Sequence, residues 1–328
     1  MRKQRDVIVL CGGFSVEREV SLTTSRQVAQ ALSGNGCRCR LIDPADYLSP
    51  QALLEAILSS TPDIVFNGLH GGAGEDGRLQ ALLELAGIPF TGSRHAASAI
   101  AMDKLASQRL AECVGLATPQ TFSLRPADNP AGAIAALGFP LVVKPNNGGS
   151  SVGITIVDNA DDMAAAIDLA RRCDSHVLLQ RFIDGRELTV TILDQSPLPV
   201  VEIKPCAGWY DYKHKYTKGE TVYEAPAVLE PGEVQTLQQQ ALAIYQAMGC
   251  EGYARIDFRS DDEANYFLEV NTLPGLTPLS LTPMAATEAG YTFQKLLETI
   301  IGVALRADWP SPFNSEQTTK QPTHKELP

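Results

Sequence analysis

Polar side chains recur at every second position in two short apolar segments of the chain. Arg255 and Asp257 alternate with apolar residues in one segment, and Glu269 and Asn271 do so in the other. In a β-strand this spacing places each set on one face. If the segments pair as a hairpin across residues 259–265, their acidic and amide side chains converge as oxygen ligands typical of magnesium, with positions left for a triphosphate. Two half-exposed edge strands are the alternative interpretation.

A glycine-rich loop follows another apolar segment, which ends at Lys144. After Pro145 and two asparagines come the glycines and serines of residues 148–153. Such a loop exposes backbone N–H groups and hydroxyls that can cradle phosphate oxygens, and a nearby lysine supplies positive charge. The Gly-Lys-Ser/Thr signature of a P-loop is absent from this sequence. A glycine hairpin with a solvated lysine is the alternative interpretation.

Three lysines, Lys104, Lys144 and Lys215, are far apart in the sequence, and each is an ordinary surface residue when considered alone. Together with magnesium ligands and a glycine-rich loop, they provide the charges that an ATP site requires. Lys215 lies in a polar, aromatic-rich segment, residues 206–225, which also contains Tyr216. We predict that this segment is a mobile lid that excludes water, with a partner-binding loop as the alternative.

Two further motifs match known signatures but lack the required context. Residues 72–77 fit the dinucleotide-binding fingerprint, yet the next predicted strand, at 88–92, ends without the acidic residue that binds a ribose. Residues 149–153 fit the nucleophile elbow of hydrolases. An elbow precedes a helix, whereas the β-branched residues 154–157 predict another strand, so Ser151 is not presented as a nucleophile. The sequence therefore argues against a dehydrogenase and against a hydrolase.

The order of the predicted elements indicates an α/β fold with α+β parts. Strands alternate with helical patterns in the first part of the chain, which predicts a parallel sheet with helices on both faces and ligands at the carboxyl ends of its strands. The predicted strands there are 6–10, 38–43, 63–70 and 88–91, with a helix at 20–32. Two helical stretches follow within 96–113, and further strands are predicted at 140–144, 153–157, 176–183, 187–193, 200–204, 252–259 and 266–271. After Trp309 the chain has almost no apolar residues, which predicts a disordered tail.

Composition and charge limit the classes of function. The 328 residues, with 44% hydrophobic and 20% charged residues, suffice for about two or three globular domains. A net charge of -11 argues against nucleic-acid binding. The apolar run at residues 7–11 is too short for a signal peptide or a membrane span. Seven cysteines without any Cys-x-x-Cys pair predict reduced thiols and a cytoplasmic location.

Short motifs with a characteristic order and spacing run through most of the chain. They are residues 12–21, 70–77, 102–104, 144–145, 149–153, 210–212, 215–216, 255–257 and 269–275. These motifs resemble those of the ATP-grasp family of D-alanine:D-alanine ligases from about Val7 to Gly302. The resemblance implies an ATP-grasp fold with an N-terminal α/β domain (1–95), a central α+β domain (96–184), a catalytic C-terminal α+β domain (185–308) and a disordered tail (309–328). It also implies ATP-dependent ligation of two D-alanine molecules through a D-alanyl phosphate, for peptidoglycan precursor synthesis, by a homodimer.

The resemblance also implies which residues bind the nucleotide and the metal. Those for the phosphates are Lys104, Lys144, Ser150, Ser151 and Lys215. The adenine would be lined by Gln180, Arg181, Phe182 and Ile183. The ribose would be bound by Glu187. Two magnesium ions, for which manganese could substitute, would be bound by Asp257, Glu269 and Asn271. Gln180 stands where the family pattern has an acidic residue contacting the adenine amino group.

The amino acid substrates have their own implied residues. Glu17 would bind the ammonium of the first D-alanine and be linked through Ser150 to Tyr216, with His70 near this substrate. The carboxylate of the second D-alanine would be bound by Ser280 and Leu281. Arg255 and the backbone N–H of Gly275 would form the oxyanion hole. Near the second substrate Leu273 and Leu279 replace expected polar residues, so a ligase that uses D-lactate or D-serine stays open as an alternative. A silent nucleotide-binding protein is the alternative from a different class.

Overall fold

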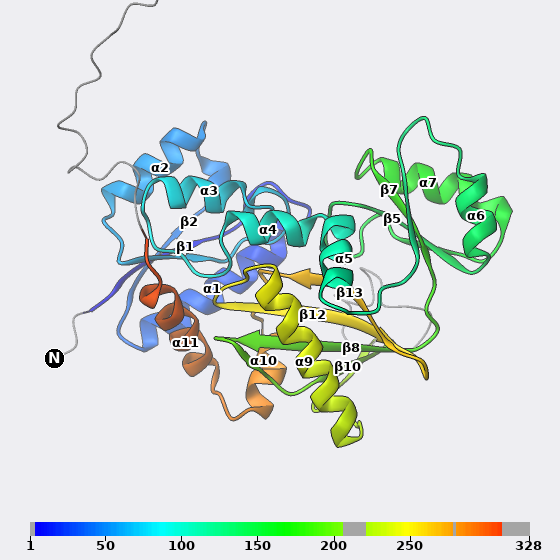
Figure 1. Cartoon of the computed structure of the whole chain (residues 1–328). Coiled ribbons are helices and arrows are strands. Elements are labelled where there is room, and N and C mark those ends of the chain that lie inside the picture. Colours follow the sequence, from blue (N-terminus) through cyan, green and yellow to red (C-terminus); the bar gives the residue numbers. More distant parts are fainter. Residues whose placement is uncertain (1–3, 206–220, 278–279, 310–328) are drawn as a thin grey trace, which may run out of the picture.

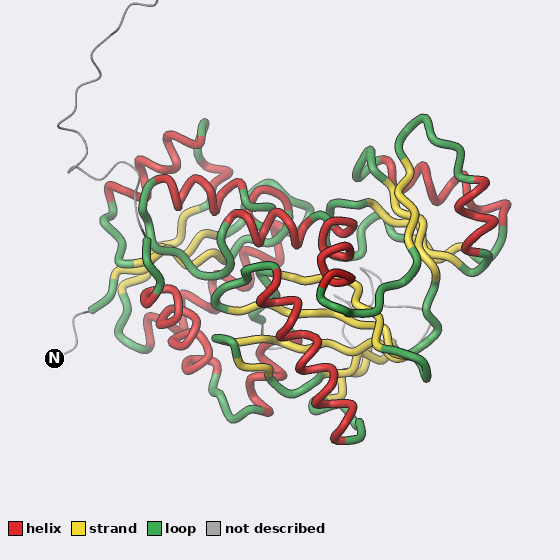
Figure 2. Tube along the Cα trace, viewed as in Figure 1, coloured by secondary structure: helices red, strands yellow, loops and turns green. Residues whose placement is uncertain are grey.

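Three β-sheets with accompanying helices organise the computed structural model of the chain (Figure 1). The structure describes residues 4–205, 221–277 and 280–309. Figure 2 shows the strands as three separate groups, one for each sheet. The first sheet is parallel and the other two are antiparallel. The predicted combination of an α/β part with α+β parts is therefore confirmed.

The first sheet has helices on both faces, as predicted. Its region contains β1 (Asp6–Leu10), α1 (Arg18–Gly34), β2 (Arg38–Ile42), η1 (Pro44–Asp46), α2 (Pro50–Ser59), β3 (Ile64–Asn67), η2 (Gly72–Gly74) and α3 (Arg78–Leu85). The strands lie in the order β2-β1-β3. Val7 and Val9 of β1 pack with α1 and with the last helix, α11 (Phe293–Arg306), whereas Ile8 and Leu10 pack against α2 and α3. Because both faces are buried, β1 is almost entirely apolar.

Residues 88–91, predicted as a strand, contribute only an isolated bridge between Phe90 and Val65. Pro89 has no backbone N–H to extend the ladder, and Gly92 turns the chain with a φ of 95°. The predicted strand is therefore wrong in its extent, although the segment lies beside β3.

The second sheet carries the glycine-rich loop. Its region contains β4 (Thr121–Leu124), α6 (Ala131–Leu137), β5 (Leu141–Pro145), β6 (Thr155–Val157), η3 (Ala160–Asp162), α7 (Met163–Arg171) and β7 (Val177–Arg181), with the strands in the order β4-β7-β5-β6. Leu141 and Val143 are buried with α7 on one face, so Val142 and Lys144 lie on the other. Residues 149–153 connect the antiparallel strands β5 and β6, as the hairpin interpretation predicts.

The third sheet carries the polar residues with strand spacing. It contains β8 (Arg186–Leu193), β9 (Ser196–Pro197), β10 (Val201–Pro205), β11 (Thr221–Glu224), β12 (Tyr253–Ser260) and β13 (Asn265–Asn271), and α9 (Pro231–Ala247) and α10 (Leu281–Glu288) pack beside it. β12 and β13 form the predicted hairpin, with Asp257 opposite Glu269 and Arg255 opposite Asn271. Ile256 is buried in the core with α9, so its polar neighbours face the opposite side of the sheet.

Two short helices connect the first and second sheets, α4 (His95–Met102) and α5 (Lys104–Cys113). The sequence assigns both to the central domain, but Ala97, Ala101 and Ala111 are buried in the core of the third sheet. Small alanine side chains let these helices approach β13 closely. These helices therefore contribute to the core of the third sheet, and α4 also packs against α3.

One end of the predicted lid is part of this sheet. Thr221–Glu224 forms the strand β11, which pairs with β10 and buries part of Tyr223 against the neighbouring core. The β-branched Thr221 and Val222 and the aromatic Tyr223 favour a strand. The loop expected over residues 206–225 is therefore wrong for these four residues. Residues 206–220 lie outside the described ranges.

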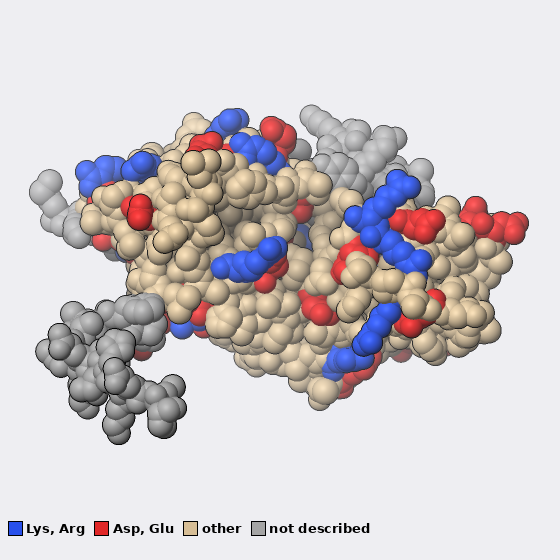
Figure 3. All heavy atoms as spheres, turned by 90° about the horizontal axis from the view of Figure 1, so that it is seen from above, with Lys and Arg blue, Asp and Glu red and all other residues tan. Residues whose placement is uncertain are grey.

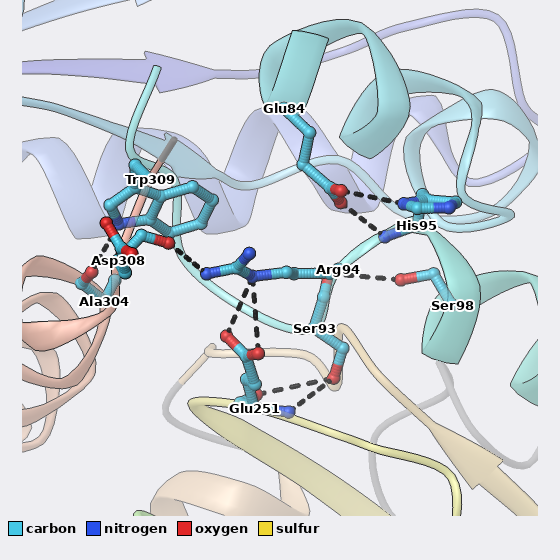
Figure 4. A network of polar contacts seen from close by, with 9 residues as sticks. All are labelled: Glu84, Ser93, Arg94, His95, Ser98, Glu251, Ala304, Asp308 and Trp309. Carbon is cyan, nitrogen blue, oxygen red and sulfur yellow. Dashed lines mark hydrogen bonds and ion pairs between the residues drawn. The ribbon is translucent and has the colours of Figure 1, made fainter. Parts of the chain in front are cut away.

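Trp309, assigned to the disordered tail, instead packs against the first sheet. Its ring centroid is 4.7 Å from that of Phe90, and its indole N–H donates to the carbonyl of Ala304 at 2.8 Å. The Arg94 guanidinium lies over the indole at 4.7 Å and its Nε is 3.3 Å from the Glu251 carboxylate (Figure 4). The network joins the end of the described chain to the first and third sheets. Residues 310–328 are not described.

The remaining features of the fold are its surface charges, its helix lengths and its cysteines. On the face seen in Figure 3, Lys and Arg side chains form several separate groups, many with acidic side chains beside them. None of the helices in the described ranges combines the length and the apolar character needed to cross a membrane. The six cysteines within these ranges are free thiols.

Candidate active site

All of the site residues that were predicted from the sequence and that the structure describes line at least one of two neighbouring cavities. The larger, of about 410 Å³, is lined by Glu17, His70, Ser150, Arg255, Asn271, Gly275, Ser280 and Leu281. The smaller, of about 120 Å³, is lined by Lys144, Ser151, Gln180, Arg181, Phe182, Ile183, Glu187 and Asp257. Lys104 and Glu269 line both cavities, so the two meet at this pair. Lys215, Tyr216 and Leu279 lie outside the described residues.

The turn after β1 brings Glu17 to the larger cavity. Gly12 has a φ of 72°, and a Cβ there would lie 2.3 Å from a neighbouring carboxylate oxygen, so only glycine fits this turn. The buried Glu17 carboxylate accepts a hydrogen bond from the Ser150 hydroxyl of the glycine-rich loop. His70 follows β3, and its Nε2 is 3.4 Å from the Thr24 hydroxyl. These groups therefore gather at the carboxyl edge of the parallel sheet, where ligands are expected.

The glycine-rich loop has a conformation that few residues adopt. Ser150 and Ser151 have φ values of 52° and 58°, in the left-handed region that is costly for residues other than glycine. The Lys104 ammonium donates to the Gly148 carbonyl at 2.6 Å and ties the loop to α5. The loop thus places one hydroxyl at each cavity, Ser150 at the larger and Ser151 at the smaller.

Opposite charges are paired where the cavities meet. Arg255 binds Asp257 through two hydrogen bonds, Nε to Oδ1 at 2.8 Å and Nη2 to Oδ2 at 2.7 Å. The Lys104 ammonium is 3.2 Å from the Glu269 carboxylate. Burial alone would raise the pKa of Glu269, but the charges of Lys104, Lys144 and Arg255 outweigh it and lower that pKa to about 2. Glu269 is therefore ionised at all physiological pH values.

Asp257, Glu269 and Asn271 provide the donor atoms that magnesium prefers. They supply two carboxylates and one amide oxygen from facing positions of the β12–β13 hairpin, and hard oxygen ligands suit magnesium better than zinc. The Thr189 hydroxyl donates to Asp257 at 2.6 Å and orients this carboxylate. Within the described residues there is no cluster of three or more His, Cys, Asp or Glu side chains for a metal. A metal here therefore depends on this mixed set, completed by ligands such as phosphate oxygens or water.

Lys144 and Gln180 face each other across β5 and β7. The Lys144 ammonium donates to the Gln180 amide oxygen at 2.9 Å, and the Gln180 amide nitrogen donates to the Thr121 hydroxyl at 2.8 Å. The family resemblance assigns the Gln180 amide oxygen to a contact with the adenine. In this structure that oxygen contacts Lys144. Burial, helped by the nearby charge of Lys104, lowers the pKa of Lys144 to about 8. Gln180 is neutral and so offsets little of this shift.

Glu187 lies on β8 at the other side of the smaller cavity. Burial raises the pKa of this carboxyl to about 7, although the positive charge of Arg259 acts in the opposite direction. The Arg259 guanidinium is 3.4 Å from the Glu187 carboxylate. The ionisation of Glu187 near neutral pH therefore depends on its cationic neighbours.

The far end of the larger cavity is formed by the start of α10. Ser280 precedes this helix, and its Oγ accepts a hydrogen bond from the Thr277 backbone N–H at 3.1 Å. A Cβ on Gly275 would lie 2.8 Å from Ser280 Oγ, so glycine permits this close approach. The first N–H groups of a helix and its dipole favour a bound carboxylate. This end of the cavity thus suits the carboxylate of an amino acid.

Some residues of the cavities were not identified from the sequence. Glu75 lines the larger cavity, is buried, and accepts a hydrogen bond from the Gly71 backbone N–H at 2.9 Å. It lies beside an irregular turn, where no periodicity marks it. Arg259 lines the smaller cavity. It continues the two-residue spacing of Arg255 and Asp257, and that signal could have found it.

Comparisons with known proteins place this geometry in a family. A family model described as "D-ala D-ala ligase N-terminus" matches residues 45–93, and one described as "D-ala D-ala ligase C-terminus" matches residues 110–302. A D-alanine–D-alanine ligase from Syntrophotalea carbinolica is 43% identical over 305 residues, which cover 93% of this chain and 98% of the relative.

Solved structures agree with the sequence relatives. A crystal structure of D-alanine–D-alanine ligase from Bacillus anthracis matches with a TM-score of 0.83 and 37% identity, covering 92% of this chain and 98% of that one. A structure of this ligase complexed with ATP matches with a TM-score of 0.81 and 34% identity over the same shares. The chain therefore belongs to the D-alanine–D-alanine ligase family, has the ATP-grasp fold and is a ligase.

Proposed function

We propose that the chain joins two D-alanine molecules to D-alanyl-D-alanine at the expense of ATP, for peptidoglycan precursor synthesis. The observation that carries this proposal is the meeting of the two cavities at Lys104 and Glu269, where a phosphoryl donor in one can reach a carboxylate in the other. The named activity of the relatives and the ATP complex of one of them support these substrates.

The smaller cavity would hold ATP. Phe182 and its neighbours at the end of β7 contact the base, Glu187 binds the ribose, and Lys144 with Lys104 and Lys215 holds the phosphates. Phosphoryl transfer demands mainly positioning and charge neutralisation from the protein. Magnesium or manganese, when bound by the β12–β13 acids, would supply positive charge at the transferred group.

The larger cavity would hold the first D-alanine with its carboxylate directed at ATP. A carboxylate is a poor electrophile, so its oxygen first attacks the γ-phosphorus and ADP leaves, which forms D-alanyl phosphate. Glu17 binds the substrate ammonium, and the hydrogen bond from Ser150 fixes the Glu17 carboxylate for this contact. His70 lies beside the same substrate, and Tyr216 extends the hydrogen-bonded series.

The second D-alanine would bind at the start of α10, with its carboxylate at Ser280 and Leu281. Its amine attacks the acyl carbon, and inorganic phosphate leaves. Arg255 and the backbone N–H of Gly275 stabilise the oxyanion of the tetrahedral intermediate, where one preorganised donor typically contributes about 3 kcal/mol. The two hydrogen bonds between Arg255 and Asp257 hold the guanidinium beside this part of the cavity.

The wider organisation belongs to the same proposal. We infer domains over residues 1–95, 96–184 and 185–308, with a lid within 206–220 that keeps water from the acyl phosphate. We also infer a homodimer that works in the cytoplasm, where its co-substrate ATP is supplied.

A coupled product assay tests this function. Purified protein receives ATP and magnesium with D-alanine, with L-alanine, or with D-alanine and D-lactate, while phosphate release and product mass are followed together. Phosphate and D-alanyl-D-alanine in equal amounts support the proposal. Phosphate with D-alanyl-D-lactate alone would assign another second substrate, and no ATP turnover under any condition would refute ligation. A Glu269→Gln protein purified in parallel controls for contaminating ligase.

A further inference from the structure

One charged side chain in the smaller cavity is not used by the mechanism above. Arg259 lies on β12, two residues beyond Asp257, and lines this cavity directly opposite Glu187 of β8. Its side chain is only 18% exposed. A guanidinium that is mostly shielded from water needs polar partners, so its contacts indicate what it holds in place.

Arg259 contacts the short connection between β7 and β8 and the start of β8. Its Nη2 is 3.4 Å from the Glu187 carboxylate, and its Nη1 donates to the Gly185 carbonyl at 2.7 Å. The guanidinium also lies 5.9 Å from the centroid of the Phe182 ring, within the range of a cation–π contact. One side chain thus contacts Phe182 and Glu187, two of the residues proposed to bind adenosine, and the backbone between them.

This connection links the second sheet to the third and has little freedom beside β12. A Cβ on Gly185 would lie 2.2 Å from the Ser260 carbonyl oxygen, so the backbone is pressed against the end of β12. The planar fork of an arginine can bind a carbonyl and a carboxylate at once, whereas a lysine ammonium is a single point of charge. The geometry therefore calls for arginine at this position.

We propose that Arg259 is a positioning residue for the nucleotide, which holds the Phe182 ring against the base of ATP and the Glu187 carboxylate against the ribose hydroxyls. This inference rests on the proposed function, because it assumes that the smaller cavity binds ATP. The charge of Arg259 also opposes the effect of burial on the pKa of Glu187 and so favours the ionised carboxylate. An ionised carboxylate accepts hydrogen bonds from both ribose hydroxyls.

Calorimetric titration of purified wild type and Arg259→Met with Mg-ADP and with Mg-2′,3′-dideoxy-ADP tests the role of Arg259. We expect Arg259→Met to weaken ADP binding by about tenfold, the usual effect of losing a contact that depends on a charged hydrogen bond. The dideoxy nucleotide lacks the hydroxyls that Glu187 binds, so its loss should be only about twofold to threefold. An unchanged ADP affinity, or an equal loss for both nucleotides, would overturn the inference.

A matched control separates the positioning of the nucleotide site from a general destabilisation of the third sheet. Arg186 is on β8 opposite Ser260, but its guanidinium binds Glu202 at 2.6 Å and the Val228 carbonyl at 2.9 Å, and it does not line the smaller cavity. Arg186→Met should leave ADP affinity unchanged, and a loss equal to that of Arg259→Met would contradict the proposal.

Arg259→Lys serves as a second variant if the methionine protein does not fold. The lysine keeps the charge without the fork, so we expect a smaller loss of ADP affinity that again exceeds the loss for the dideoxy nucleotide. Wild type that forms dipeptide while both Arg259 variants bind ADP normally would refute only this inference. Wild type that forms no dipeptide would refute the proposed function instead.

Discussion

The two cavities of this ligase are built in different ways. The smaller takes most of its residues from neighbouring strands, such as Arg259 and Asp257 on β12 and Glu187 on β8. The larger takes most of its residues from helices and from the segments between elements, such as Glu17 after β1 and Ser280 before α10. Strand positions are fixed by the sheet, whereas the segments depend on how three sheets pack together. Substrate contacts in the larger cavity should therefore respond more strongly to changes in packing.

The largest expected effect lies where the cavities meet. Glu269→Gln removes a carboxylate charge that lines both cavities. We expect kcat to fall by about 100-fold to 1000-fold, the usual effect of losing a preorganised group that stabilises charge in a transition state. Steady-state dipeptide formation measures this. Glu263→Gln, on the exposed turn of the same hairpin, should retain full kcat. A Glu269→Gln protein with wild-type kcat would remove this residue from the site.

The next effect should be confined to the larger cavity. Glu17→Gln takes away the charge that faces the substrate ammonium, so we expect KM for the first D-alanine to rise by about tenfold to 100-fold while KM for ATP stays unchanged. Initial rates measured while the D-alanine and ATP concentrations are varied independently give the two KM values. The exposed Glu55→Gln on α2 is the control. Equal rises in both KM values would show that the cavities do not act separately.

A pH effect should be confined to the smaller cavity. The pKa of Lys144 is lowered to about 8, so its positive charge is present below that pH and is lost above it. We expect KM for ATP to rise by up to about tenfold between pH 7 and 9, because the phosphates lose a cationic partner. Gln180→Glu would place a carboxylate against the Lys144 ammonium and raise its pKa, which moves this rise to higher pH.

Kinetic profiles of wild type and Gln180→Glu across this pH range provide the measurement. Gln195→Glu, an exposed change of the same kind, should follow the wild-type profile. Identical profiles for Gln180→Glu and wild type would mean that Lys144 does not set the pH dependence of ATP binding.

The smallest effect on catalysis is expected far from both cavities. Trp309→Ala removes the contacts with Phe90 and Arg94, so we expect the free energy of unfolding to fall by about 2 kcal/mol, less than for a fully buried tryptophan. KM for D-alanine and for ATP should stay unchanged.

A chain that ends after Trp309 should keep both stability and activity in thermal unfolding and dipeptide assays. A large loss of turnover in that truncation would contradict the expected disordered tail.

The same contrast explains which parts of the site could be predicted from sequence. Arg255, Asp257 and Glu269 show strand periodicity, and the structure places them on one hairpin face as their spacing indicates. Glu17 and Ser280 have no such periodicity, because they lie outside strands and come to line the same cavity only through the packing of distant segments. Their place in the site came from the family resemblance alone.

Packing also produces contacts that the sequence pattern does not specify. Ala97 and Ala111 lie in helices that precede the second sheet in the sequence, yet they are buried under the third. Nothing in an alanine-rich helical pattern specifies which sheet it covers. Trp309 stands next to a polar tail, and its burial depends on a contact with Phe90 that is distant in the sequence.

The central claim is that phosphoryl transfer activates the carboxylate of the first D-alanine where the two cavities meet. D-alanine labelled with ¹⁸O in both carboxylate oxygens tests it, with mass analysis of the phosphate and the dipeptide. The account predicts one ¹⁸O in each inorganic phosphate released with dipeptide, because the carboxylate oxygen that attacks the γ-phosphorus leaves with it. Unlabelled phosphate formed together with dipeptide would contradict the acyl phosphate route.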